Sequence, residues 1–83
     1  MRMNKQQFFI TSDLNLSAVL VAHGFVLDKV EKTSTGKSKF LFEYSENIEK
    51  LIDKYWKGKI KMNPQDIFVS LKVIKNRLYS SYS

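Results

Sequence analysis

The sequence contains no cysteine, one histidine, one proline and three glycines among 83 residues. Without cysteine there are no disulfides and no thiolate metal ligands, which favours a reducing compartment. A lone histidine, His23, excludes the paired imidazoles of common metal sites and leaves no Ser–His–Asp or Cys–His set. The sequence therefore predicts a protein that is not an enzyme and that holds no cofactor or metal.

Long hydrophobic runs are also missing. The longest, residues 18–22, is far short of the roughly 20 apolar residues that a membrane span requires. The apolar residues 8–10 are too few for the core of a signal peptide. We expect a soluble, cytoplasmic protein with no membrane partner, folded as a single domain over residues 1–83 with frayed ends at 1–5 and 80–83.

Positive charge is in excess, and it is concentrated in one part of the chain. Residues 1–49 carry six bases and six acids, whereas residues 50–83 carry eight bases and two acids. The whole net charge of +6 therefore belongs to the last two predicted helices and the segment between them. Such asymmetry is typical of proteins that bind a polyanion.

Apolar periodicity predicts three strands, at residues 7–11, 25–32 and 39–44. The turn-forming residues 33–38 join the last two strands into a hairpin between residues 25 and 44. Phe40, Phe42 and Tyr44 are expected on one face of the third strand. The Gly-Lys-Ser sequence of residues 36–38 ends like a phosphate-binding loop, but Glu31 stands where that motif needs glycine, so a hairpin loop is preferred.

Helical spacing and capping residues predict three helices. The first covers residues 12–23, with Asp13 in its first turn and Gly24 just past its end. The second lies between the N-cap Ser45 and Gly58. The third begins with Pro64 directly after the N-cap Asn63. The apolar stripe of the second helix is expected in the core and comprises Ile48, Leu51, Ile52, Tyr55 and Trp56.

These elements give an α+β fold, a three-stranded sheet with three helices in the order β-α-β-β-α-α and the helices on one face. The place of the first strand stays open. A right-handed crossover would put it parallel to the second strand. Pairing with the third strand is equally consistent with the sequence.

A set of residues distributed over most of the chain matches a known family pattern. It comprises Phe9, Thr11, Asp13, Leu14, Leu16, Ala18, Leu20, Gly24, Phe25, Phe40, Phe42, Tyr55, Trp56, Gly58, Asn63, Pro64, Phe68, Leu71 and Lys75. On these residues the chain resembles the domain of unknown function 5659, a family of small bacterial and prophage proteins. The resemblance implies an accessory protein of a phage or mobile element, in a bacterial cell, and brings no catalytic residues.

Basic residues recur on one side of each of the last two helices. On the second helix they lie opposite the apolar stripe, and an extended segment after that helix would continue them. If the last two helices pack side by side, seven cations and one aromatic residue cover a single surface: Lys50, Lys54, Lys57, Lys59, Lys61, Lys72, Lys75 and Tyr79. The alternative is a solvated face that serves only solubility.

Lysine is a point charge that lacks the bidentate fork with which arginine reads guanine. Twelve of the fourteen bases are lysine, so the sequence favours low-specificity contact with a nucleic-acid backbone or with an acidic protein surface. The aromatic rings of Tyr79 and Tyr82 are available to stack on unpaired bases. Trp56 is expected in the core instead.

Val69 and Val73 fall on the side of the third helix where polar residues are expected. They indicate a seam for a homodimer or a partner helix, unless other parts of the monomer cover them. The leading hypothesis is therefore a non-enzymatic nucleic-acid-binding protein. The alternative is a protein-interaction module that inhibits or adapts a host or phage protein, for example a defence-system inhibitor.

Overall fold

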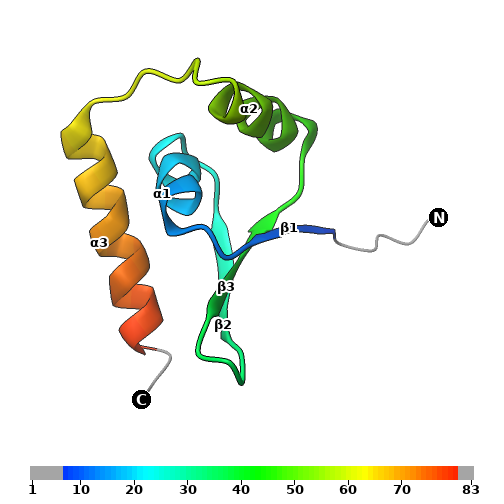
Figure 1. The fold of residues 1–83 in the computed structure, drawn as a ribbon, viewed down its shortest axis with the longest axis vertical. Helices are drawn as coiled ribbons and strands as arrows, with labels where there is room; N and C mark the ends of the chain where they lie inside the picture. The colour runs from blue at the N-terminus through cyan, green and yellow to red at the C-terminus, as the bar shows by residue number, and fades with distance from the viewer. Residues whose placement is uncertain (1–6, 81–83) are drawn as a thin grey trace.

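Residues 7–80 are described by a computed structural model with three strands and three helices in the predicted order (Figure 1). The elements are β1 (Phe8–Thr11), α1 (Leu14–Ala22), β2 (Leu27–Lys32), β3 (Ser38–Glu43), α2 (Glu46–Trp56) and α3 (Pro64–Ser80). The predicted α+β class and hairpin are confirmed, and element ends differ from the predicted ones by one or two residues. Of the ends predicted to fray, 1–5 and 80–83, all but Ser80 lie outside the described residues, and Ser80 is the last residue of α3.

The three strands form one antiparallel sheet in the order β1-β3-β2. β3 is the central strand, with Phe9 of β1 opposite its Phe42 and β2 on its other edge. Of the two places left open for the first strand, the one beside the third is correct. In the turn between β2 and β3, the amide of Thr33 donates to the carbonyl of Lys37 at 3.0 Å, and Gly36 has a φ of 88°, which glycine adopts without strain.

Each helix is preceded by a polar residue whose side chain accepts a hydrogen bond from a backbone amide of the first turn. The Asp13 carboxylate accepts a hydrogen bond from the amide of Leu16 at 3.1 Å, and Ser45 and Asn63 cap α2 and α3 in the same way. The prediction that Asp13 lies within the first turn is wrong, because Asp13 is itself the cap. The helix therefore starts at Leu14, two residues later than predicted.

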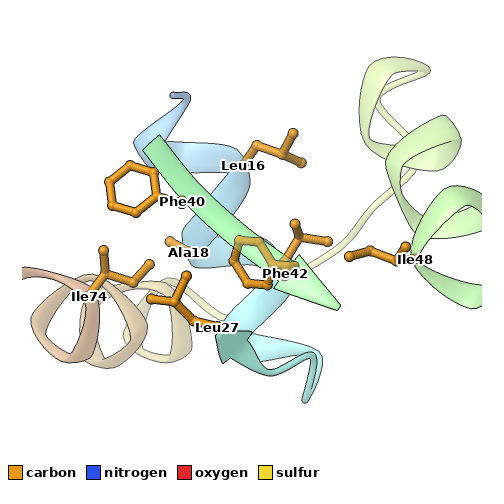
Figure 2. Packing of buried hydrophobic residues seen from close by; sticks show 8 residues of the cluster. Leu16, Ala18, Leu27, Phe40, Phe42, Ile48 and Ile74 are labelled. Carbon is orange, nitrogen blue, oxygen red and sulfur yellow. The ribbon is translucent and has the colours of Figure 1, made fainter. Parts of the chain in front are cut away.

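One hydrophobic core lies between the sheet and the helices. Phe42 is completely buried, and Figure 2 shows it among residues of α1, α2 and the strands. Ile48 of α2 and Ile74 of α3 enter the cluster from opposite sides (Figure 2). Tyr44, predicted on the same face as Phe40 and Phe42, lies just past the end of β3 and is exposed, whereas the two phenylalanines are buried.

α1 is the central helix of the molecule. α3 packs along it and α2 contacts it separately, so α1 lies between the last two helices (Figure 1). The expectation that α2 and α3 pack side by side is therefore wrong. The segment that joins them, residues 57–63, crosses the end of α1, where Ile60 and Met62 line a pocket together with Val19. This segment is long enough to span α1, so α2 and α3 can each pack against α1 without packing against each other.

Arg77 ties the end of α3 to the start of β2. Its guanidinium donates to the carbonyl of Leu27 at 2.8 Å and to that of Asp28 at 3.0 Å. The pairing register shifts between Leu27 and Lys29, so this part of β2 is irregular, and such bulges leave backbone groups without sheet partners. The sequence showed Arg77 only as one more base, whereas the structure shows it as a link between two elements.

Candidate nucleic-acid interface

Five exposed lysines follow one another in sequence along α2 and the segment after it, and we call this set the basic ridge. At 100° per residue, Lys50 and Lys54 of α2 and its C-cap Lys57 fall within an arc of about 60°, roughly opposite the completely buried Ile48. All five are exposed, as the sequence predicted: Lys50, Lys54, Lys57, Lys59 and Lys61.

The end of α2 keeps the backbone of Lys59 next to the helix. Gly58 has a φ of 69°, and the amide of Lys59 donates to the carbonyl of Lys54 at 3.0 Å. This is the hydrogen bond of a Schellman motif, and it fixes the backbone of Lys59 next to the last turn of the helix. Beyond it, exposed Lys59 and Lys61 alternate with partly buried Ile60 and Met62, as the extended segment requires.

Carboxylates limit the ridge on one side. Lys57 forms an ion pair with Asp53 at 2.9 Å, and both side chains are more than half exposed. Glu46 and Glu49 share the flank of α2 with Asp53. An exposed pair of this kind is weak and exchanges readily, so Lys57 stays available to an anion. The other four lysines of the ridge form no ion pair within the described residues.

A second basic group lies on α3. Lys72, Lys75 and Tyr79 are exposed on one flank of that helix, which exposed Phe68 shares. Because α1 separates α3 from α2, the seven predicted cations do not form one helix–helix surface. The structure brings together the five lysines of the ridge and leaves the α3 group as a separate patch.

Val69 and Val73 are open to solvent, with 61% and 45% of their surfaces exposed. The alternative that other parts of the monomer cover them is therefore wrong. One helical turn beyond Val73, Arg77 binds the start of β2, where Val26 is also exposed. The predicted seam is thus an uncovered apolar strip, and nothing in the described residues packs over its centre.

Trp56 is the largest departure from the sequence prediction. Its side chain is 67% exposed, whereas the neighbouring Tyr55 packs against the core. The two rings meet edge-on, with 5.1 Å between their centroids. Burial, with a smaller contribution from the charge of Asp13, raises the pKa of Tyr55. The acidic residues three and seven positions before Trp56, Asp53 and Glu49, lie on the same flank and were the sequence signal that this flank faces solvent.

The remaining candidates are the lone histidine, a metal-ligating cluster, a membrane span and the aromatic residue near the chain end. His23 meets the carbonyl of Val19 at 3.0 Å through Nδ1, as expected at a helix end. Among residues 7–80, no three histidine, aspartate or glutamate side chains converge as metal ligands, and no helix has the length and apolarity to cross a membrane. Tyr82, expected as a free aromatic residue, lies outside these residues.

Comparison with protein-family models shows one match. Residues 6–80 match the model described as a domain of unknown function, DUF5659. Comparisons with curated proteins and with solved structures gave no match.

Proposed function

Because this chain belongs to the family of the domain of unknown function 5659, whose description assigns no activity, we propose its function from its own surface. The protein binds the backbone of nucleic acids with little sequence specificity, without catalysis, through the basic ridge. It acts as an accessory protein of a phage or mobile element in the bacterial cytoplasm. The observation that carries this proposal is the exposure of all five lysines along α2 and the segment that follows it, where the Lys59–Lys54 hydrogen bond keeps the backbone of Lys59 next to the helix end.

The spacing of the ridge suits a phosphate backbone. Four helical residues rise about 6 Å, and two extended residues advance about 6.6 Å. Each strand of a duplex presents one phosphate about every 3.4 Å along the axis, so successive lysines meet about every second phosphate. Lysine contacts of this kind supply affinity without reading bases. The α3 patch of Lys72, Lys75 and Tyr79 offers a second, separate contact.

A single-lysine substitution tests the ridge. Replacing Lys59 with alanine is expected to make the log–log salt dependence of DNA binding shallower by about 0.9, the contribution of one phosphate contact. Fluorescence anisotropy of labelled duplex DNA over a series of salt concentrations measures that slope. Lys37→Ala removes an equally exposed lysine from the hairpin turn and is expected to leave the slope unchanged. Equal slopes for both variants would show that Lys59 does not touch phosphate.

A second function is favoured by the exposed apolar strip of α3. An uncovered pair of valines one turn apart, beside exposed Phe68, is the kind of surface that a partner helix or a second copy covers. On this alternative the protein is an interaction module that inhibits or adapts a host or phage protein, such as a component of a defence system. The neighbouring lysines would then steer it toward an acidic protein surface.

Charge placed in the strip tests this alternative. The double variant Val69→Asp, Val73→Asp is expected to abolish a dimer or partner complex while nucleic-acid binding and helix content are retained, because both side chains are exposed. Sedimentation velocity measures the oligomeric state, and circular dichroism the helix content. Ser34→Asp, in the exposed hairpin turn, is the matched control. A dimer that survives the double substitution would exclude the strip as its interface.

A further inference from the structure

The flank of α2 that bears Trp56 faces a groove of about 400 Å³ between α2, β1 and the end of β3. Its apolar walls come from three elements, and two carboxylates stand among them. The lining residues are Phe9, Tyr44, Glu49, Ile52, Asp53 and Trp56. The basic ridge does not include this groove, because Trp56 lies about 100–160° around α2 from the three lysines of that helix.

The indole of Trp56 is largely exposed. It makes an edge-on contact, at 79° between the ring planes, with Tyr55, a residue that packs on the core. An exposed aromatic ring beside partly buried Phe9 and Ile52 is a large apolar surface for a monomer to leave open. Tryptophan and tyrosine are the residues most often found at the energetic centre of protein interfaces.

The charge of the groove is opposite to that of the protein as a whole. Glu49 and Asp53 line it, and the adjoining hollow of about 430 Å³ adds Glu46 together with Lys50 of the basic ridge at its edge. A hydrogen bond to Glu49, followed by burial and the charges of Glu49 and Glu46, raises the pKa of Tyr44, and the phenol therefore lies beside that carboxylate. Asp53 is engaged by Lys57, but through an exposed pair that another cation can replace.

We propose that this groove binds a basic segment of a partner protein, in which an arginine or lysine lies against Trp56 and the carboxylates while apolar neighbours contact Phe9 and Ile52. The face of an indole is the best cation–π acceptor among side chains. Carboxylates beside it add charge-assisted hydrogen bonds to the same guanidinium or ammonium group. The site goes beyond the proposed nucleic-acid function and uses a different face of α2.

Charge complementarity selects this occupant over others. Nucleic acid is repelled by the carboxylates of the groove. Two copies that met groove to groove would bring like charges together, since a two-fold interface pairs a patch with itself. A copy that used its own lysine ridge to fill the groove of the next would form a head-to-tail ring or an open-ended chain, and the ridge would no longer be available to nucleic acid. A separate protein with a basic, partly apolar segment meets none of these obstacles.

Trp56 is the only tryptophan of the protein, so its fluorescence reports directly from the proposed site. Titration with a short peptide that alternates arginine and valine is expected to change the emission saturably, whereas a matched peptide that alternates glutamate and valine leaves it unchanged. The double variant Glu49→Gln, Asp53→Asn is expected to bind the arginine peptide with an affinity at least about tenfold lower. Circular dichroism confirms that this variant, altered only at exposed residues, keeps its helix content.

A substitution of Lys57 is expected to change peptide binding and DNA binding in opposite directions. Lys57→Met removes the ion-pair partner of Asp53 and is expected to raise the affinity for the arginine peptide by about two- to fivefold. The same substitution removes a cation from the ridge and is expected to weaken DNA binding. Trp56→Ala, followed by anisotropy of the labelled peptide, is expected to lose peptide binding and to keep DNA binding.

Three results would overturn the proposal. The first is an absence of saturable fluorescence change with the arginine peptide. The second is an equal response to the glutamate peptide, which would mean that the groove binds apolar side chains without regard to charge. The third is self-association of the wild-type protein that Trp56→Ala abolishes, which would make a second copy the occupant.

Discussion

Raising the salt concentration from about 50 to about 200 mM is expected to weaken duplex DNA binding by this protein about 500-fold. Each lysine that neutralises a phosphate contributes about −0.9 to the log–log slope, so the five lysines of the basic ridge give a slope of about −4.5. For single strands the contribution is about −0.7 per contact, and the expected loss is about 130-fold. Anisotropy of labelled single- and double-stranded DNA and RNA measures both values.

The slope also gives the number of lysines that contact phosphate. If Lys72 and Lys75 of α3 join the ridge on the same duplex, seven contacts give a slope of about −6.3 and a loss of about 6000-fold. A slope near −4.5 would instead assign binding to the ridge alone. The measurement therefore decides whether the lysines of α3, which α1 separates from α2, bind the same duplex as the ridge.

Reversal of charge on the ridge is the matching substitution. With Lys54, Lys57, Lys59 and Lys61 replaced by glutamate, nucleic-acid binding is expected to be lost, because phosphate attraction becomes repulsion. Helix content is expected to be unchanged, since all four side chains are exposed. Reversal of the exposed hairpin lysines Lys29, Lys37 and Lys39 is the control and is expected to weaken binding far less. Binding that survives reversal would exclude the ridge, and no binding of the wild type at about 50 mM salt would make its charge a matter of solubility.

Replacement of Phe42 by alanine is expected to destabilise the protein by about 3–5 kcal/mol. Phe42 is completely buried on the central strand and touches residues of the core that come from both the sheet and the helices. A domain of this size has an unfolding free energy of about 4–12 kcal/mol, so the variant retains little of it. Urea unfolding followed by circular dichroism gives the loss from the shift of the midpoint.

Ile10 supplies the control for this substitution. It belongs to the same sheet, one position after the Phe9 that pairs with Phe42, but its side chain is 52% exposed. Ile10→Ala is expected to cost less than about 1 kcal/mol, since it leaves no cavity. Similar losses for the two variants would mean that Phe42 is not the centre of the core.

The order and type of the elements could be predicted because their signals are local. Ser45 caps α2 and Asn63 caps α3 with hydrogen bonds to amides two or three residues away. Gly58 ends α2 because its own φ is positive, a conformation that glycine adopts without strain. Each of these features depends on a few neighbouring residues, so each can be read from a short stretch of sequence.

The exposure of the lysines was predictable for a related reason. Their positions on α2 follow the helical repeat, and Lys59 and Lys61 follow the alternation of an extended segment. Trp56 did not follow the same reasoning. It stands at the border of the apolar stripe, where burial depends on how far the neighbouring elements reach, and most of its surface is exposed beside Phe9 of β1.

The sequence by itself thus determined the α+β class, the order of the elements, the hairpin, the helix caps and the row of lysines along α2 and the following segment. Only the tertiary structure decided that β1 pairs with β3, that α1 separates α2 from α3, and that Trp56 lines an acidic groove. The difference has one physical cause. Capping, turn formation and periodicity are decided among residues close in the chain, whereas strand order and helix packing depend on competition between distant contacts whose local preferences are the same.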